Sequence, residues 1–254
     1  TILFCILVFI IIPVIIYAAS YYPYWNATGE TRPWYEIILK NQQDMYNYHS
    51  QLKATHGYQS DWYTWPVMYL PMFYYLGPND AENMSAIYAF GNPMVWYSGL
   101  VCTLMSICIF VKRFMGGTVA INPLNKNQSG FFKLFEAGDE GSLDLTRRDT
   151  GTLLFLILAL ASNLLPWVGV GRCIFIYHYF ASVPFIILFT VYILRHFARK
   201  NIKWGAVVTI AVCVIALVLF IMFKPLWTGT SVSRDYVEHF LRWMPSWFAY
   251  WFPN

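Results

Sequence analysis

Residues 151–194 read GTLLFLILALASNLLPWVGVGRCIFIYHYFASVPFIILFTVYIL. They contain two long apolar runs, 151–170 and 174–194, separated by a short junction with one charged residue, Arg172. About 20 apolar residues in a helix are enough to cross the roughly 30 Å hydrocarbon core of a bilayer. The stretch therefore predicts two membrane-spanning helices joined by a tight connection.

Three more apolar runs of this kind lie at about 1–20, 93–112 and 204–223. The composition agrees with them, because 58% of the 254 residues are apolar and only 12% are charged, whereas about 25% of residues are charged in soluble domains. The net charge of +4 is small and scattered over the loops, which disfavours a nucleic-acid-binding protein. We therefore expect an all-α polytopic membrane protein with about five transmembrane helices.

The segments outside these spans differ in composition. Residues 21–92 and the tail 224–254 are rich in Trp and Tyr, which favour the boundary between membrane and water. In the first segment we expect interfacial helices, one at 44–52 and a further turn at 85–90, and in the tail an interfacial aromatic segment. Residues 113–150 are polar and glycine-rich, which is typical of a flexible connection.

Lysine and arginine are distributed unevenly between the two sides of the predicted membrane. The connection after the fourth span holds Arg195, Arg199, Lys200 and Lys203, whereas the connection before it holds only Arg172. Because cytoplasmic loops carry the excess of basic residues, we expect the amino end inside and the carboxyl end outside. The sequence opens within an apolar run without an initiator Met, so we also expect a piece of a longer protein that begins at or inside a span.

The junction between the third and fourth spans is the strongest candidate site. Arg172 stands at the edge of hydrocarbon, where its planar guanidinium suits the phosphate of an outer-leaflet lipid; the alternative is a snorkelling arginine that binds ordinary lipid headgroups. If the span is a continuous helix, His178 lies about 9 Å deeper. A lone histidine here is more often a hydrogen-bonded core residue than a catalyst, but the flanking Tyr177 and Tyr179 make a polar patch that suggests a cavity for a polar ligand.

The first outside loop holds a second polar and aromatic cluster, formed by His49, His56, Asp61, Trp62 and Trp65. Stacking of a sugar ring on Trp, with His or Asp accepting its hydroxyl groups, fits this composition. An interfacial membrane anchor is the alternative. Metal binding is less favoured, since the two histidines share a helix face only if a helix continues between them, and a third ligand is missing.

Other reactive residues predict no site. The five cysteines lie in apolar segments without a CxxC pair, so they are expected to be buried hydrophobes. The adjacent acids Asp139 and Glu140 lie in a glycine-flanked loop and are expected to be solvated rather than catalytic. We expect no metal ion and no cofactor.

Three stretches together resemble a known family. Residues 49–66, HSQLKATHGYQSDWYTWP, residues 91–93, GNP, and residues 165–185, LPWVGVGRCIFIYHYFASVPF, resemble protein O-mannosyltransferases, the polyprenyl- or dolichyl-phosphate-mannose-dependent enzymes of the GT-C class. The resemblance covers most of residues 45–190, and the orientation predicted from charge agrees with the last five spans of that family. Gly171 and Ala181 stand where the family has proline, at two bends.

The resemblance implies an inverting transfer of mannose from a lipid-phosphate carrier to Ser or Thr of a protein acceptor. It implies that the lipid-phosphate-sugar is held by Arg172, Tyr177, His178 and Tyr179. It implies that acceptor or sugar is contacted by His49, His56, Trp62 and Trp65. No catalytic residue is expected within the 254 residues, because the acidic motif that supplies the base belongs to an upstream part of such enzymes.

The short first loop leaves no room for the β-trefoil insertion of eukaryotic members, so the resemblance implies a bacterial-type enzyme in a plasma membrane. Two alternatives remain open. One is a GT-C transferase for another sugar or for a lipid acceptor. The other is a lipid-binding or transport subunit, although spans almost free of charged residues disfavour ion or proton transport.

Overall fold

The computed structural model describes residues 2–29, 31–51, 53–116 and 143–252. The pair Asp139 and Glu140, and most of the predicted 113–150 connection, lie outside the described residues. The chain divides into two compact units, Thr1–Thr55 and His56–Asn254, and each has its own internal packing.

The first unit is a long apolar helix followed by an amphipathic one. Helix α1 (Ile2–Ile6), a π turn η1 (Leu7–Ile11) and α2 (Ile12–Thr28) follow one another directly, and Gly29 then ends the helix in a left-handed conformation with φ 64°. The candidate span Ile2–Thr28 is longer than the predicted 1–20. Helix α3 (Trp34–Gln51) begins ten residues before the helix predicted at 44–52 and buries Ile37.

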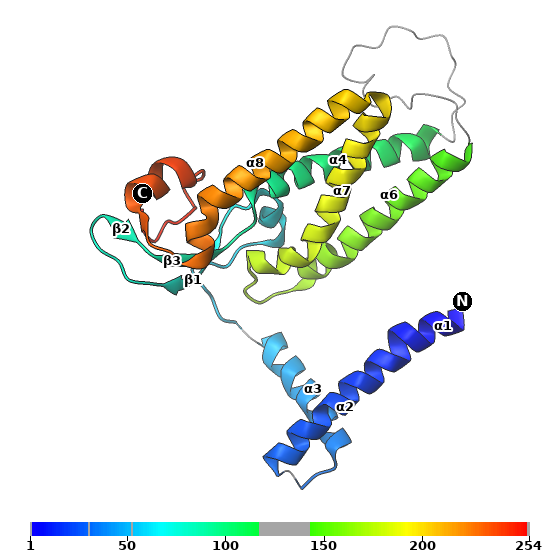
Figure 1. Cartoon of the computed structure of the whole chain (residues 1–254). Helices are drawn as coiled ribbons and strands as arrows, with labels where there is room; N and C mark the ends of the chain where they lie inside the picture. Colours follow the sequence, from blue (N-terminus) through cyan, green and yellow to red (C-terminus); the bar gives the residue numbers. More distant parts are fainter. Residues whose placement is uncertain (1, 30, 52, 117–142, 253–254) are drawn as a thin grey trace. The chain divides into compact units, whose positions relative to one another are not determined.

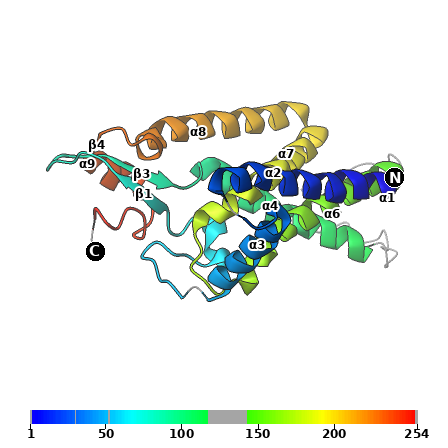
Figure 2. The same cartoon turned by 90° about the horizontal axis from the view of Figure 1, so that it is seen from below.

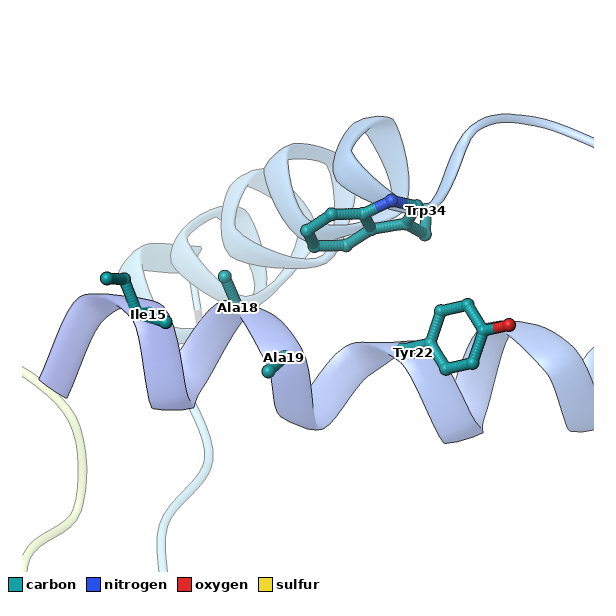
Figure 3. A pocket seen from close by; sticks show the side chains of 5 residues that line it. All are labelled: Ile15, Ala18, Ala19, Tyr22 and Trp34. Carbon is teal, nitrogen blue, oxygen red and sulfur yellow. The ribbon is translucent and has the colours of Figure 1, made fainter. Parts of the chain in front are cut away.

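Helices α2 and α3 are joined by polar contacts and leave an apolar cavity beside them. Gln42 of α3 donates to the hydroxyl groups of Tyr17 and Tyr21 on α2. A cavity of about 500 Å³ is lined by Ile15, Ala18, Ala19, Tyr22 and Trp34. Figure 3 shows the indole of Trp34, at the start of α3, facing the stretch of α2 that holds the two alanines. The small alanine side chains leave this space open.

The second unit is built on four long helices, α4 (Pro93–Gly116), α6 (Leu143–Leu164), α7 (Val183–Lys200) and α8 (Ile202–Thr228). Helix α7 packs against α4, α6 and α8, and α4 also packs against α6 and α8. Figures 1 and 2 both show strands β1 and β3 and the carboxyl-terminal segment at one end of these helices, here called the strand end.

Five helical segments in the described part of the chain are long and apolar enough to cross a membrane, as the all-α membrane fold predicts. They are Ile2–Thr28, Pro93–Phe114, Asp149–Gly169, Ile176–Lys200 and Ile202–Thr228. Between α4, α6 and α7 lies a buried apolar cluster, which consists of Cys102, Ile109, Leu153, Leu156, Phe189 and Ile193. The outward faces remain apolar and exposed, which suits hydrocarbon as the surrounding solvent.

The predicted helical turn at 85–90 is wrong, because this segment is a strand. Strand β3 (Ala86–Ala89) pairs antiparallel with β1 (Met72–Leu76), and β2 (Asn83–Met84) pairs antiparallel with β4 (Val232–Ser233). The register of β3 with β1, from Met72 opposite Ala89 to Leu76 opposite Ala86, fixes this segment as extended rather than helical. A 3₁₀ segment, η2 (Trp62–Val67), precedes β1.

The carboxyl-terminal tail folds into the core of the second unit instead of lying only at an interface. After β4 come α9 (Arg234–Tyr236) and a π turn, η5 (Val237–Leu241). Trp247 and Phe248 are buried, and the indole of Trp247 donates to the carbonyl of Met68 at 2.7 Å. The prediction of an interfacial aromatic tail is therefore wrong for these two side chains.

The close packing of α7 and α8 gives a test of this fold. A Cβ atom at Gly205 of α8 would lie 2.4 Å from the Cα of Ala198 on α7, so Gly205→Ala forces the two helices apart. We expect a loss of about 1–3 kcal/mol, seen as a lower melting temperature in detergent.

Gly151→Ala is the matched control, because Gly151 of α6 has open space around its Cα and alanine favours a helix. An equal melting temperature for Gly205→Ala and Gly151→Ala would contradict the predicted close approach.

Candidate functional site

The junction between α6 and α7 is a run of short turns rather than a helix. Helix α6 passes into the 3₁₀ turn η3 (Leu165–Gly169), an irregular stretch follows at 170–175, and a second 3₁₀ segment, η4 (Ile176–Ser182), leads into α7. Pro166 and Pro184 lie in the first turn of η3 and of α7, where a missing N–H costs nothing. The expected helical rise between Arg172 and His178 is therefore wrong, since His178 lies at the start of the span.

His178 lies in an aromatic enclosure with one ring nitrogen unused. Its imidazole stacks on Trp167 at 4.0 Å between ring centroids, with Tyr177 at 4.4 Å and Trp65 at 6.0 Å. The Nε2 atom is shielded from solvent and has no hydrogen-bond partner among the described residues. A buried polar atom without a partner is costly, so the enclosure offers a hydrogen-bond position that a ligand can fill.

Arg172 supplies the positive charge at this place. The side chain is half-buried in the irregular stretch, and its charge acts on His178. It makes no hydrogen bond or ion pair with the residues that the structure describes. The guanidinium therefore keeps its donors available for an anion, which it binds best through two parallel bonds to a phosphate or carboxylate.

The two tyrosines beside His178 have different surroundings. Tyr177 is partly exposed and stacks on Tyr74 of β1 at 6.2 Å and on Phe175 at 5.4 Å. Tyr179 is only 3% exposed, and its ring packs on Trp96 of α4 at 5.0 Å. The expected patch of Tyr177, His178 and Tyr179 is thus divided, with Tyr177 in the site and Tyr179 in the core.

Trp65 of η2 is a buried support for the site. Its side chain has no exposed surface, and its indole N–H donates to the carbonyl and the hydroxyl of Ser60. The Ser60 N–H in turn donates to the carbonyl of Ile174 at 2.9 Å, which ties the loop to the junction. The expectation that Trp65 stacks on a sugar is wrong, because its side chain is fully buried and meets Trp167 in an edge arrangement. Trp62 is partly buried beside Tyr63.

The two histidines of the first loop belong to different units of the chain. Helix α3 ends at Gln51, so no helix face joins His49 to His56, and they belong to different units. His49 makes a ring contact with Tyr48. His56 is exposed, accepts the N–H of Tyr58 through Nδ1, and meets the ring of Phe175 at 5.2 Å. His56 is therefore placed beside the junction within the second unit.

Sequence reasoning missed Tyr74, Phe175 and the stacking role of Trp167. Tyr74 comes to the junction through the pairing of β1 with β3, which no local pattern predicts. Burial and the neighbouring Tyr177 raise the pKa of the Tyr74 phenol, so it stays a neutral hydrogen-bond donor. Asp61 accepts the hydroxyl of Tyr63 at 2.8 Å, and this hydrogen bond together with the negative charge of the carboxylate raises the pKa of the Tyr63 phenol.

Residues 34–247 match the family model described as the C-terminal four TMM region of protein-O-mannosyltransferase. This range contains α3 to α8 and every site residue named above. Over 211 residues the chain is 23% identical to Protein O-mannosyl-transferase 2 of Drosophila pseudoobscura, covering 72% of this chain and 27% of the relative. It is 22% identical to the Polyprenol-phosphate-mannose–protein mannosyltransferase of Corynebacterium glutamicum, covering 79% of this chain and 35% of the relative.

The fold is also similar to a solved structure, that of the S. cerevisiae protein O-mannosyltransferase Pmt1-Pmt2 complex bound to the sugar donor. The TM-score is 0.68 at 17% identity, over 86% of this chain and 27% of the yeast chain. The present chain thus spans about a third or less of the proteins it resembles. The family model nevertheless covers most of the present chain, at residues 34–247. The chain therefore belongs to the protein O-mannosyltransferase family and is part of an integral membrane protein.

Proposed function

We propose that this chain forms the donor-binding part of a membrane enzyme that moves mannose from a polyprenyl- or dolichyl-phosphate carrier to Ser or Thr of proteins, with inversion. The proposal is carried by two groups of the junction. The guanidinium of Arg172 makes no hydrogen bond with the described residues, and its charge acts on His178, whose buried Nε2 also has no hydrogen-bond partner there. Both groups bind anions or hydroxyls, and both stand at the end of a span, where the phosphate of a lipid carrier lies.

The printed names of two relatives support a lipid-phosphate donor. A Candida albicans relative, 22% identical over 215 residues, is named Dolichyl-phosphate-mannose–protein mannosyltransferase 5. The name of the Corynebacterium relative contains polyprenol phosphate in place of dolichyl phosphate. The chemistry agrees, because transfer releases the lipid phosphate as an anion. A fixed positive charge that meets this developing anion lowers the barrier most when water is kept out.

The residues have separate roles in this proposal. Arg172 holds the lipid phosphate and stabilises it as it leaves. His178 donates or accepts one hydrogen bond at the phosphate or the sugar, while Trp167 and Trp65 hold its ring and exclude water. Tyr177 contributes an aromatic face beside it. Tyr179, packed on Trp96, only positions the segment.

The described residues around Arg172 and His178 offer no carboxylate to deprotonate the acceptor hydroxyl, since Asp61 is engaged with Tyr63. We propose that another part of the full-length enzyme supplies this base, because the relatives are several times longer than the region matched here.

The proposed orientation places the strand end outside. The opposite end of the four helices holds eight basic residues in the described part of the chain, Lys112, Arg113, Arg147, Arg148, Arg195, Arg199, Lys200 and Lys203, and Arg199 pairs there with Asp149 at 2.8 Å. Such an excess favours the cytoplasm. Arg172 then faces the outer leaflet. We propose the plasma membrane of a bacterium as the location, on the shortness of the first outside loop.

Arg172 is the first residue to test. In the full-length enzyme we expect Arg172→Ala to lower kcat/KM for the lipid-linked donor roughly 10- to 100-fold, the effect of losing a charged hydrogen bond of about 1.5–3 kcal/mol. Arg172→Lys keeps the positive charge but loses the planar guanidinium, so its kcat/KM should lie between those of the wild type and Arg172→Ala. Mannosyl transfer to an acceptor peptide is the measurement.

Lys224→Ala is the matched control, since it removes an exposed positive charge from the same end of the helices without touching the junction. Equal kcat/KM for Arg172→Ala and the wild type, in protein with an unchanged melting temperature, would make Arg172 a simple headgroup anchor.

His178→Phe keeps the ring stacked on Trp167 but removes Nε2. We expect transfer to fall roughly 5- to 10-fold, the effect of one neutral hydrogen bond of about 1 kcal/mol or slightly more. His196→Phe is the control, because His196 also has a buried Nε2 without a partner in the described chain but lies at the other end of the same span. If both variants lose the same activity, the position of His178 is irrelevant and its role as a ligand contact is wrong.

Orientation is tested with a cysteine at each end of α8. Lys203 and Lys224 are both exposed and lie near the beginning and the end of this helix. In a background whose native cysteines are replaced by Ser, Lys224→Cys should react with a membrane-impermeant maleimide in intact cells. Lys203→Cys should react only after the cells are opened. The reverse pattern would place the strand end in the cytoplasm.

A further inference from the structure

The pairing of β1 with β3 contains a bulge at Tyr74. Phe73 lies opposite Tyr88 and Tyr75 lies opposite Ile87, so two neighbouring residues of β3 face three of β1, and Tyr74 has no partner in the register. A bulge adds a residue to one strand and turns its side chain in a new direction, often beside a functional site. Here the extra residue is directed at the junction, where its ring stacks on Tyr177.

The ring of Tyr74 begins a continuous row of aromatic side chains. Tyr74 stacks on Tyr177 at 6.2 Å with 25° between the ring planes, and Tyr177 stacks on Phe175 at 5.4 Å with 21°. Phe175 meets the edge of His56 at 5.2 Å. These four residues, here called the aromatic row, come from β1, from the junction and from the first loop.

The row is accessible, unlike the aromatic side chains that hold the fold. Tyr74 is 54% exposed and His56 is exposed as well, while Tyr177 and Phe175 are partly so. Phe73, next to Tyr74, instead stacks on Tyr58 and Tyr250 and contacts the buried Tyr88. Tyr74 therefore contributes little to the core, and its placement is explained better by a ligand than by packing.

The position of the row distinguishes it from the donor site. One of its members, Tyr177, adjoins His178 at 4.4 Å between ring centroids. Tyr74, Phe175 and His56 lie outside the five candidate spans. Under the proposed function a lipid-linked donor reaches Arg172 and His178 from the membrane, whereas these three members of the row stand in segments outside the spans, which a protein acceptor can reach.

We propose that the aromatic row is the docking surface for an extended segment of the acceptor polypeptide, with Tyr74 as a specificity-determining residue. The inference rests on the proposed function. Extended segments rich in Pro dock on exposed aromatic side chains, because their backbone is already in the bound conformation. Segments that combine Ser or Thr with Pro are also typical O-glycosylation targets. A membrane anchor is the competing explanation, but anchoring needs no bulge.

The test uses the full-length enzyme in detergent and a Ser- and Thr-containing acceptor peptide with flanking prolines. Tyr74→Ala should raise the acceptor KM at least about fivefold and leave kcat and the KM of the lipid-linked donor unchanged. Tyr74→Phe keeps the ring and should behave as the wild type. Tyr75→Ala is the matched control, because Tyr75 is 52% exposed on the same strand but has no ring contact with the row.

A second measurement detects docking without turnover. A photoreactive benzoylphenylalanine at position 74 should crosslink to the peptide, and the same group at position 75 should not. An unchanged acceptor KM in folded Tyr74→Ala overturns the inference, as does a rise in the donor KM alone. If Arg172→Ala leaves kcat/KM for the donor unchanged while position 74 still crosslinks to the peptide, the proposed donor site is wrong and the acceptor surface is supported.

Discussion

The second unit depends on one constraint, which is that backbone polar groups near hydrocarbon must find partners inside the protein. The junction at 165–182 breaks the helix and frees several such groups. The loop before β1 satisfies part of this need, because the Ser60 N–H donates to the carbonyl of Ile174. The indole N–H of Trp96 then binds the carbonyl of Trp65 at 2.8 Å and joins the loop to α4. The irregular junction and its loop therefore exist together.

This constraint explains why the segments at the strand end form a packed body. Trp65 covers the junction only if something holds η2 in place, and the tail does so when Trp247 donates to the carbonyl of Met68. Met68 has a left-handed φ of 55° that ends η2, which is unusual for a residue with a side chain. The strand pair β2 and β4 then connects the loop to the tail. Aromatic burial in this body replaces the interfacial role that composition alone suggests.

The sequence predicts the features that depend on local pattern, and these include the five apolar spans and the junction with Arg172 and His178. It fails where residues far apart in the chain decide the structure. The strand at 86–89 looks like a short turn until β1 is placed beside it, and Trp65 looks like a sugar platform until Trp167 and Ser60 cover it. Tyr179 resembles Tyr177 in sequence, but Trp96 of α4 takes it into the core.

The hydrogen bonds around the junction show which polar groups the fold uses and which it leaves for the proposed donor. The carbonyl of Ile174 in the junction accepts the Ser60 N–H, while the indole N–H groups of Trp65 and Trp96 donate to Ser60 and to the carbonyl of Trp65 in the loop. None of these hydrogen bonds uses the guanidinium of Arg172 or Nε2 of His178. A positive charge held half-buried without a counter-ion costs free energy, and an anionic headgroup recovers that cost on binding. Under the proposed function, the charge of Arg172 therefore serves a ligand, whereas the aromatic side chains around His178 are part of the packing.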